Sequence, residues 1–221
     1  MVLWGIWRAR NDKLWNHTVK PAESVVSSAV QHLMDWRAVR NIVETQERTI
    51  QQDGESVTWK KPLAHALKCN VDASIQNDSR TIGVGMVLRD SYGLFISAKT
   101  NCFSGSVGIK NAEAMAFKEA LSWIEGMDVQ EVIVESDSKI VVEAISTEKE
   151  DISEFGAIIS ECRKVIRQRP SFRVSFARRQ ANKVAHNLAR ASCFYARPSI
   201  WITPPDFILD VLNEDCNSLV S

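Results

Sequence analysis

Three carboxylates stand where a sheet and a helix would bring them to one place. Asp72 follows the alternating stretch KCNV, Glu113 lies early in a long helical pattern, and Asp137 follows the apolar run EVIVES. Each has an ordinary alternative: a solvated edge charge for Asp72, a first-turn glutamate favoured by the helix dipole for Glu113, and a helix N-cap for Asp137. If the strands that carry the two aspartates are neighbours, the three oxygen donors converge.

Such a cluster has a defined chemistry. Three carboxylates that repel one another need cations to remain together at pH 7, and Mg²⁺ is the natural occupant of a site made only of oxygen. Two such ions about 4 Å apart activate a water molecule and stabilise the leaving oxygen of a phosphodiester.

Hydrophobic periodicity indicates the elements that position these groups. Residues 67–103 alternate in three runs separated by turns, which predicts a three-stranded antiparallel meander with Asp72 facing away from the apolar side of the first strand. Gly83 and Gly85 lie inside the second strand and indicate a bulge or a close backbone approach. Asp90 begins the turn DSYG before the third strand.

The second half of the chain alternates helices and strands. The predicted order is β-β-β-α-β-α-α-β-α, an α/β fold with a mixed five-stranded sheet flanked by helices. It is not a purely doubly wound sheet, and no GxGxxG motif follows a strand. Asp151 or Ser153 is expected to cap the helix that ends before Pro170. The other expected elements are a helix over 111–125, a strand over 131–135, a helix over 138–145, a strand over 172–177 and a helix over 181–196.

Composition divides the chain into four parts. Residues 1–45 form a tryptophan-rich segment with two expected helices, 46–62 are a polar linker, 63–197 are the α/β domain, and 198–221 are a tail. Pro21 precedes one of the expected helices, at a position where helix starts tolerate proline. These tryptophans also allow a reading of the protein as an interaction module with the helices as its contact surface. They are Trp4, Trp7, Trp15 and Trp36.

Charge is balanced overall and polarised along the chain. Basic and acidic residues number 27 each, yet 111–154 holds 3 basic and 12 acidic residues and 157–197 holds 10 basic and 1 acidic. This distribution is typical either of a basic face for phosphates or of two solvated faces that attract each other.

Cysteine usage and the N-terminus indicate the compartment. The five cysteines lack CxxC spacing, so neither a disulfide framework nor a zinc site is expected, which fits a reducing environment. The opening apolar run VLWGIW is too short for a signal sequence or a membrane span. We expect an intracellular, soluble protein with no membrane partner, in either the nucleus or the cytoplasm.

Four motifs in order resemble one known family. KCNVDAS around Asp72, AEAMA around Glu113, ESDS around Asp137 and the later run RRQANKVAHNLAR are similar to the ribonuclease H type 1 family. The resemblance covers 59–196 and is nearest to the reverse-transcriptase-like plant branch, found as the last domain of non-LTR retroelement polyproteins. It implies a ribonuclease-H-like fold and two-metal hydrolysis of the RNA strand in RNA–DNA hybrids. It also implies that the three carboxylates are catalytic metal ligands.

The last helix departs from the family pattern. The family places a fourth acidic ligand four residues after an asparagine, and here Asn182 is followed at that spacing by His186. Imidazole nitrogen coordinates Mn²⁺ better than Mg²⁺, so we include His186 as a weaker fourth metal ligand and catalytic residue. Its ordinary alternative is a partly exposed helix residue near Arg190. The loop before this helix also lacks the histidine that active members often carry.

Two hypotheses for function follow from these residues. The first is a metal-dependent endonuclease, a hydrolase that cleaves RNA in RNA–DNA hybrids with Mg²⁺ or Mn²⁺. The second is a catalytically weakened, retroelement-derived domain that binds nucleic acid without cutting it. In either case recognition is expected to depend on duplex shape and the 2′-hydroxyl. Position in the sequence predicts the contacts with nucleic acid as Ser74, Asn111, Arg178, Arg179, Asn182 and Lys183.

Overall fold

The chain divides into two compact units, Met1–Ser56 and Val57–Ser221, in a computed structural model. In the first unit, residues 22–27 form a helix directly after Pro21, as predicted, and the Val25 N–H donates to the Pro21 carbonyl. The four N-terminal tryptophans, the predicted linker up to residue 57 and most of the predicted turn before Arg80 lie outside the described residues. The structure describes residues 10, 19, 21–27, 58–76, 80–127, 129–195 and 197–217.

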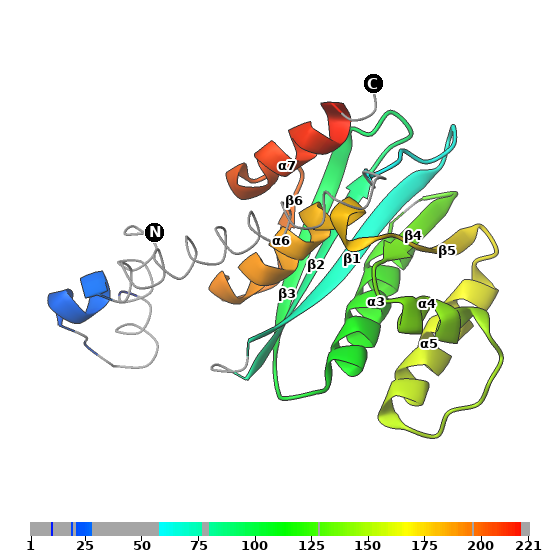
Figure 1. The fold of residues 1–221 in the computed structure, drawn as a ribbon, viewed down its shortest axis with the longest axis horizontal. Helices are drawn as coiled ribbons and strands as arrows, with labels where there is room; N and C mark the ends of the chain where they lie inside the picture. Colours follow the sequence, from blue (N-terminus) through cyan, green and yellow to red (C-terminus); the bar gives the residue numbers. More distant parts are fainter. Residues whose placement is uncertain are drawn as a thin grey trace, which may run out of the picture. The chain divides into compact units, whose positions relative to one another are not determined.

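A mixed sheet forms the centre of the second unit (Figure 1). Its strands are β1 (Leu67–Gln76), β2 (Thr81–Arg89), β3 (Phe95–Ser104), β4 (Val132–Ser136), β5 (Phe172–Phe176) and β6 (Ser199–Trp201). They lie in the order β5-β4-β1-β2-β3-β6. The pairs β1–β2, β2–β3 and β3–β6 are antiparallel, while β4 is parallel to both β1 and β5. The predicted meander and mixed sheet are confirmed.

The sheet has six strands, so the predicted number of five is wrong. The sixth strand, β6, comes from the segment after Pro198, where residues 199–201 pair with residues 98–100 of β3. Three residues are too few for a period-2 pattern, and the partner strand is distant in sequence. The tertiary fold therefore creates this strand.

Helices cover both faces of the sheet (Figure 1). On one face lie α3 (Ile109–Glu125), α4 (Lys139–Ser146) and α5 (Glu154–Gln168), which share an apolar core with the Cys69–Val71–Ala73 side of β1. On the other face lie α6 (Lys183–Ala191) and α7 (Asp206–Asn217), packed on Val87 and Ala98. Within the described ranges, no helix combines the length and apolar character needed to cross a membrane.

Gly83 and Gly85 allow α6 to lie directly on β2. A Cβ atom on Gly85 would collide with the backbone of Ala185 and Ala189, and one on Gly83 would collide with the Ala189 carbonyl oxygen. The predicted close backbone approach is confirmed, and the bulge alternative does not apply at these glycines because the register shift falls at Leu88 and Arg89.

Helix ends follow the sequence signals with small shifts. α3 begins at Ile109, two residues before the predicted start, and ends as predicted at Glu125. Ser153 is the N-cap of α5, and its hydroxyl accepts a hydrogen bond from the Gly156 N–H. The predicted helix over 181–196 consists of α6 with a 3-10 turn on either side, over Arg179–Ala181 and Ser192–Phe194.

A buried arginine joins both ends of the second unit to the sheet. Arg89 is 1% exposed and lies 3.6 Å from the Trp59 ring centroid. Its guanidinium donates to Asn70 Oδ1 at 2.8 Å and to Asp215 Oδ2 of α7 at 2.6 Å. The C-terminal tail therefore docks on the sheet through a buried ion pair as well as apolar contacts.

Candidate metal centre

The carboxylates of Asp72, Glu113 and Asp137 converge from three elements. β1 and β4 are parallel neighbours with Val71 opposite Ser136, so the register places Asp72 of β1 opposite Asp137, the residue after β4. Glu113 approaches from α3. One oxygen of each side chain lies within 4.8 Å of the oxygens of the other two. The predicted convergence of the three side chains is therefore present.

The ordinary alternatives for these carboxylates fit less well. Because α3 begins at Ile109, Glu113 lies beyond the first turn, and the first turn contains no acidic residue. The N-cap residue of α4 is Ser138 rather than Asp137. Asp72 is only 3% exposed, which does not fit a solvated edge charge.

Burial and mutual repulsion set the electrostatics of the cluster. Burial, and then the charges of Asp72 and Asp137, raise the pKa of Glu113 to about 9. Burial and the neighbouring Asp72 likewise raise the pKa of Asp137 to about 6. The positive charge of Arg179 opposes both shifts. The surroundings therefore do not neutralise three ionised carboxylates, and without a cation the protonated form of Glu113 is favoured at neutral pH.

This donor set fits a hard divalent cation. Among the described residues, Glu113 Oε2 is a buried oxygen with no hydrogen-bond partner, and such an orphan is costly. The three-residue group contains carboxylate oxygens alone, which are ligands that Mg²⁺ and Mn²⁺ accept. A bound cation would partner the orphaned oxygen and offset the repulsion among the carboxylates.

Asn182 positions the cluster from the opposite face of the sheet. Its amide nitrogen donates to the Val71 carbonyl at 3.0 Å and lies 3.4 Å from Asp137 Oδ1. Because Asn182 is only 1% exposed, its side chain hydrogen-bonds to other parts of the protein rather than facing solvent. Sequence reasoning assigned it to nucleic acid and missed this positioning contact, for which a lone asparagine before a helix gives no signal.

His186 lies directly beside Asp72. The imidazole Nδ1 is 2.7 Å from Asp72 Oδ2, and when Nδ1 carries its proton it donates to that carboxylate. The distance-defined group of three carboxylates does not include His186. Its location at the cluster agrees with the sequence spacing, while its role as a metal ligand stays a prediction.

The residues predicted to contact nucleic acid lie in different settings. Arg178 and Arg179 are exposed at the start of the 3-10 turn that leads into α6. The Asn111 amide nitrogen donates to Glu154 Oε2 at 2.8 Å, while its own Oδ1 is buried without a partner. The Ser74 hydroxyl donates to the Ala189 carbonyl at 3.0 Å, and Lys183 Nζ lies 3.7 Å from Glu214. The two arginines are the freest to meet a phosphate.

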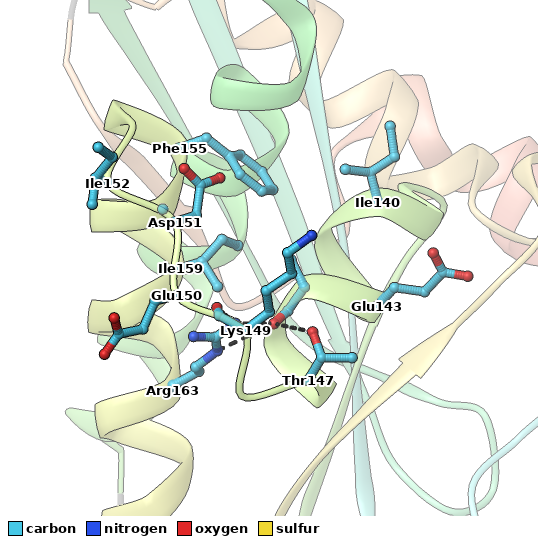
Figure 2. A pocket seen from close by; sticks show the side chains of 12 residues that line it. Ile140, Glu143, Thr147, Lys149, Glu150, Asp151, Ile152, Phe155, Ile159 and Arg163 are labelled. Carbon is cyan, nitrogen blue, oxygen red and sulfur yellow. Dashed lines mark hydrogen bonds between the residues drawn. The ribbon is translucent and has the colours of Figure 1, made fainter.

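A surface pocket of about 690 Å³ lies apart from the carboxylates. Figure 2 shows it between α4 and α5, with Phe155 and Ile159 on the α5 side and Ile140 on the α4 side. Arg163 donates to the carbonyl oxygens of Ala144 and Lys149 and so ties the connecting loop to α5. None of the three carboxylates lines this pocket, and it is not part of the metal centre.

Comparison with protein families and curated proteins gives one match. A family model described as reverse transcriptase-like matches residues 70–192. This range contains the three carboxylates, Asn182 and His186. No curated protein matches the sequence.

Solved structures with a similar fold include several ribonucleases H. RNase H1 from the halophilic archaeon Halobacterium salinarum NRC-1 has a TM-score of 0.53 at 16% identity, over 58% of this chain and 97% of that chain. The N-terminal RNase H domain of rv2228c from Mycobacterium tuberculosis has a TM-score of 0.50 at 15% identity, over 71% and 99%. LC11-RNase H1, isolated from compost by a metagenomic approach and solved with an RNA/DNA hybrid, has a TM-score of 0.50 at 18% identity, over 57% and 95%. The likeness confirms the predicted ribonuclease-H-like fold.

Proposed function

The chain belongs to the reverse transcriptase-like family, and we propose from this membership and from its carboxylate cluster that it is a metal-dependent endonuclease that cleaves the RNA strand of RNA–DNA hybrids. The observation that carries the proposal is the convergence of Asp72, Glu113 and Asp137 within 4.8 Å. Three buried or half-buried carboxylates at this separation are unfavourable without a cation, and a phosphodiester nuclease uses such cations.

Different residues of this chain have different roles at the metal centre. Asp72, Glu113 and Asp137 would hold the ions, with His186 as a weaker fourth ligand. Mg²⁺, or Mn²⁺ in its place, would supply an activated water and stabilisation of the leaving oxygen. Asn182 binds both the Val71 carbonyl of β1 and the Asp137 carboxylate and so holds the two elements together. The exposed Arg178 and Arg179 bring positive charge to the same end of α6, where they would meet phosphate.

The fold and the charge of the chain support this substrate class. LC11-RNase H1 has been solved with an RNA/DNA hybrid, and its fold is shared by this chain. We assign the contacts to the hybrid to Ser74, Asn111, Arg178, Arg179 and Lys183. Asn182 acts beneath them as a positioning residue. The hybrid would be read by shape and by the 2′-hydroxyl rather than by base edges.

One contact favours a second candidate function. His186 Nδ1 is hydrogen-bonded to Asp72 Oδ2 at 2.7 Å, and this oxygen would otherwise be available to a cation. A domain in which the histidine keeps that oxygen would bind nucleic acid through its basic residues and leave it intact.

The motifs around the site further support an origin in the plant non-LTR retroelement branch, and with it an intracellular location in the nucleus or cytoplasm.

Cleavage of a labelled hybrid by the purified full chain tests the proposal. Wild type and Asp72→Asn are incubated with an RNA–DNA hybrid, a DNA duplex or an RNA duplex, in Mg²⁺, Mn²⁺ or EDTA. We expect wild type alone to cut the RNA strand of the hybrid, and only with metal. Equal cleavage by both proteins would identify a contaminant and overturn the proposal. Absence of cleavage together with hybrid binding that weakens steeply with salt would establish the second function.

A further inference from the structure

Two cysteines distant in sequence meet between β3 and the turn that follows α6. Cys102 lies in β3 and Cys193 in the 3-10 turn Ser192–Phe194, and the Cys102 thiol donates to Cys193 Sγ at 3.1 Å. Both thiols are free and partly exposed. We propose that Cys102 and Cys193 are a modification site, a dithiol that a small-molecule disulfide oxidises reversibly to an intramolecular disulfide.

The backbone holds the two cysteines side by side. Cys102 pairs across the sheet with Gly83, and Gly83 has no side chain to keep the turn away. A Cβ on Gly83 would collide with the Ala189 carbonyl oxygen and with Ser192 Oγ. Because Ser192 immediately precedes Cys193, this contact with β2 sets the second thiol next to the first. The two sulfur atoms are 3.1 Å apart, about 1 Å more than the length of a sulfur–sulfur bond.

The surroundings give the two thiols different roles. Burial, followed by the hydrogen bond to Cys193, raises the pKa of Cys102 to about 12, so Cys102 retains its proton in the reduced pair. Cys193 accepts that hydrogen bond and also lies 3.5 Å from the Thr81 hydroxyl. A thiol attacks a disulfide only after it loses its proton, and Cys102 retains its own, so we assign the attack to Cys193.

The reaction with oxidised glutathione balances in two exchanges. The Cys193 thiolate attacks one glutathione sulfur, which forms a mixed disulfide and releases one glutathione thiolate. Cys102 then gives up its proton and attacks the Cys193 sulfur, which forms the intramolecular bond and releases the second glutathione. Two protein thiols are oxidised, one glutathione disulfide is reduced to two thiols, and the protons from the cysteines pass to those thiols.

The bond would fasten the C-terminal end of α6 to the sheet. The same helix is preceded by Asn182 and carries His186, the two residues that contact the carboxylate cluster. The disulfide closes the long loop 102–193 and so restricts the unfolded chain. We expect the melting temperature to rise by about 5 °C or more and the amides of α6 to exchange more slowly with solvent.

Oxidation of the full chain in glutathione buffers of increasing oxidised fraction tests this proposal. We expect intact mass to show the loss of two hydrogen atoms, the count of free thiols to fall from five to three, and peptide mapping to join Cys102 to Cys193. The change should reverse with excess reduced glutathione. A stable mixed disulfide with glutathione, a link through another cysteine, or five free thiols in fully oxidised buffer would each overturn it.

Cys216→Ser is the matched control for Cys193→Ser. Cys216 is also partly exposed, but its sulfur lies 3.9 Å from the Gly93 carbonyl rather than beside a thiol. Cys216→Ser should keep the oxidation-dependent rise in melting temperature, and Cys193→Ser should lose it. If both variants respond alike, the pair is not the site. The mass and mapping of the unsubstituted chain decide the question even if a variant fails to fold.

Discussion

The imidazole Nδ1 of His186 lies 2.7 Å from Oδ2 of Asp72, although 114 positions separate the two residues. Asp72 is nearly buried, whereas the His186 side chain is 26% exposed, so the histidine covers the carboxylate from the solvent side. This contact joins α6 to the ligand-bearing part of β1. It also distinguishes the two candidate functions, because a cation and the imidazole would compete for the same Asp72 oxygen.

Replacing His186 with a carboxylate tests that contact. We expect His186→Asp to raise Mg²⁺-supported cleavage of a hybrid by roughly 10-fold or more, because a hard oxygen donor replaces a nitrogen that Mg²⁺ binds poorly. The variant should also melt at a lower temperature in EDTA and recover with Mg²⁺, because a fourth carboxylate adds repulsion. His186→Asn is the control. No gain over His186→Asn in cleavage would remove His186 from the metal centre.

Asn182→Ala should weaken both the fold and the site. The substitution removes a donor to the buried Val71 carbonyl and the contact with Asp137, so we expect a loss of about 1–3 kcal/mol in the free energy of unfolding. Urea denaturation measures this change. Asn187→Ala, at a partly exposed position of α6, is the matched control and should cost less than about 0.5 kcal/mol. Equal costs for the two variants would contradict a positioning role for Asn182.

The carboxylate cluster predicts that the metal-free protein loses stability as pH rises. The pKa of Glu113 is raised from 4.5 to about 9 and that of Asp137 from 3.8 to about 6, so between these values the folded state binds more protons than the unfolded chain. The free energy of unfolding therefore falls as pH rises through this window.

Melting temperatures measured between pH 5 and pH 9 in EDTA check that stability falls as pH rises. Glu113→Gln should show a smaller fall than wild type, because it cannot ionise, and the difference should widen up to about pH 9. Added Mg²⁺ should flatten the wild-type curve. Parallel curves for wild type and Glu113→Gln in EDTA would show that Glu113 does not titrate in the folded cluster.

Gly85→Ala tests the close packing of α6 on β2. The added methyl group would collide with the Ala189 N and with the Ala185 carbonyl oxygen, which are backbone atoms that cannot rotate away. We expect a loss of about 1–3 kcal/mol or more in the free energy of unfolding, measured in urea. Gly108→Ala serves as the control because a methyl group added there would meet no atom within 4 Å, and it should be close to neutral. If Gly85→Ala were equally neutral, the helix would not depend on this contact.

Strand alternation, helical spacing and capping residues were enough to predict most of the helices and strands. Strand alternation predicts β1 with Asp72 facing away from the apolar side, and the helical pattern predicts α3 with Glu113 early in it. Ser153 caps α5 as its residue type suggests. β6 could not be found in this way, because residues 199–201 become a strand only when the edge of β3 offers unpaired backbone groups.

The sequence by itself determined the kinds of side chain, their spacing and the elements that carry them, because periodicity and capping act over a few neighbouring residues. Only the tertiary structure decided that β1 and β4 are parallel neighbours, that Asn182 reaches Val71 and Asp137, and that His186 covers Asp72. Those relationships join residues far apart along the chain. Their distances depend on sheet order and on how closely α6 packs against Gly83 and Gly85, which no local pattern encodes.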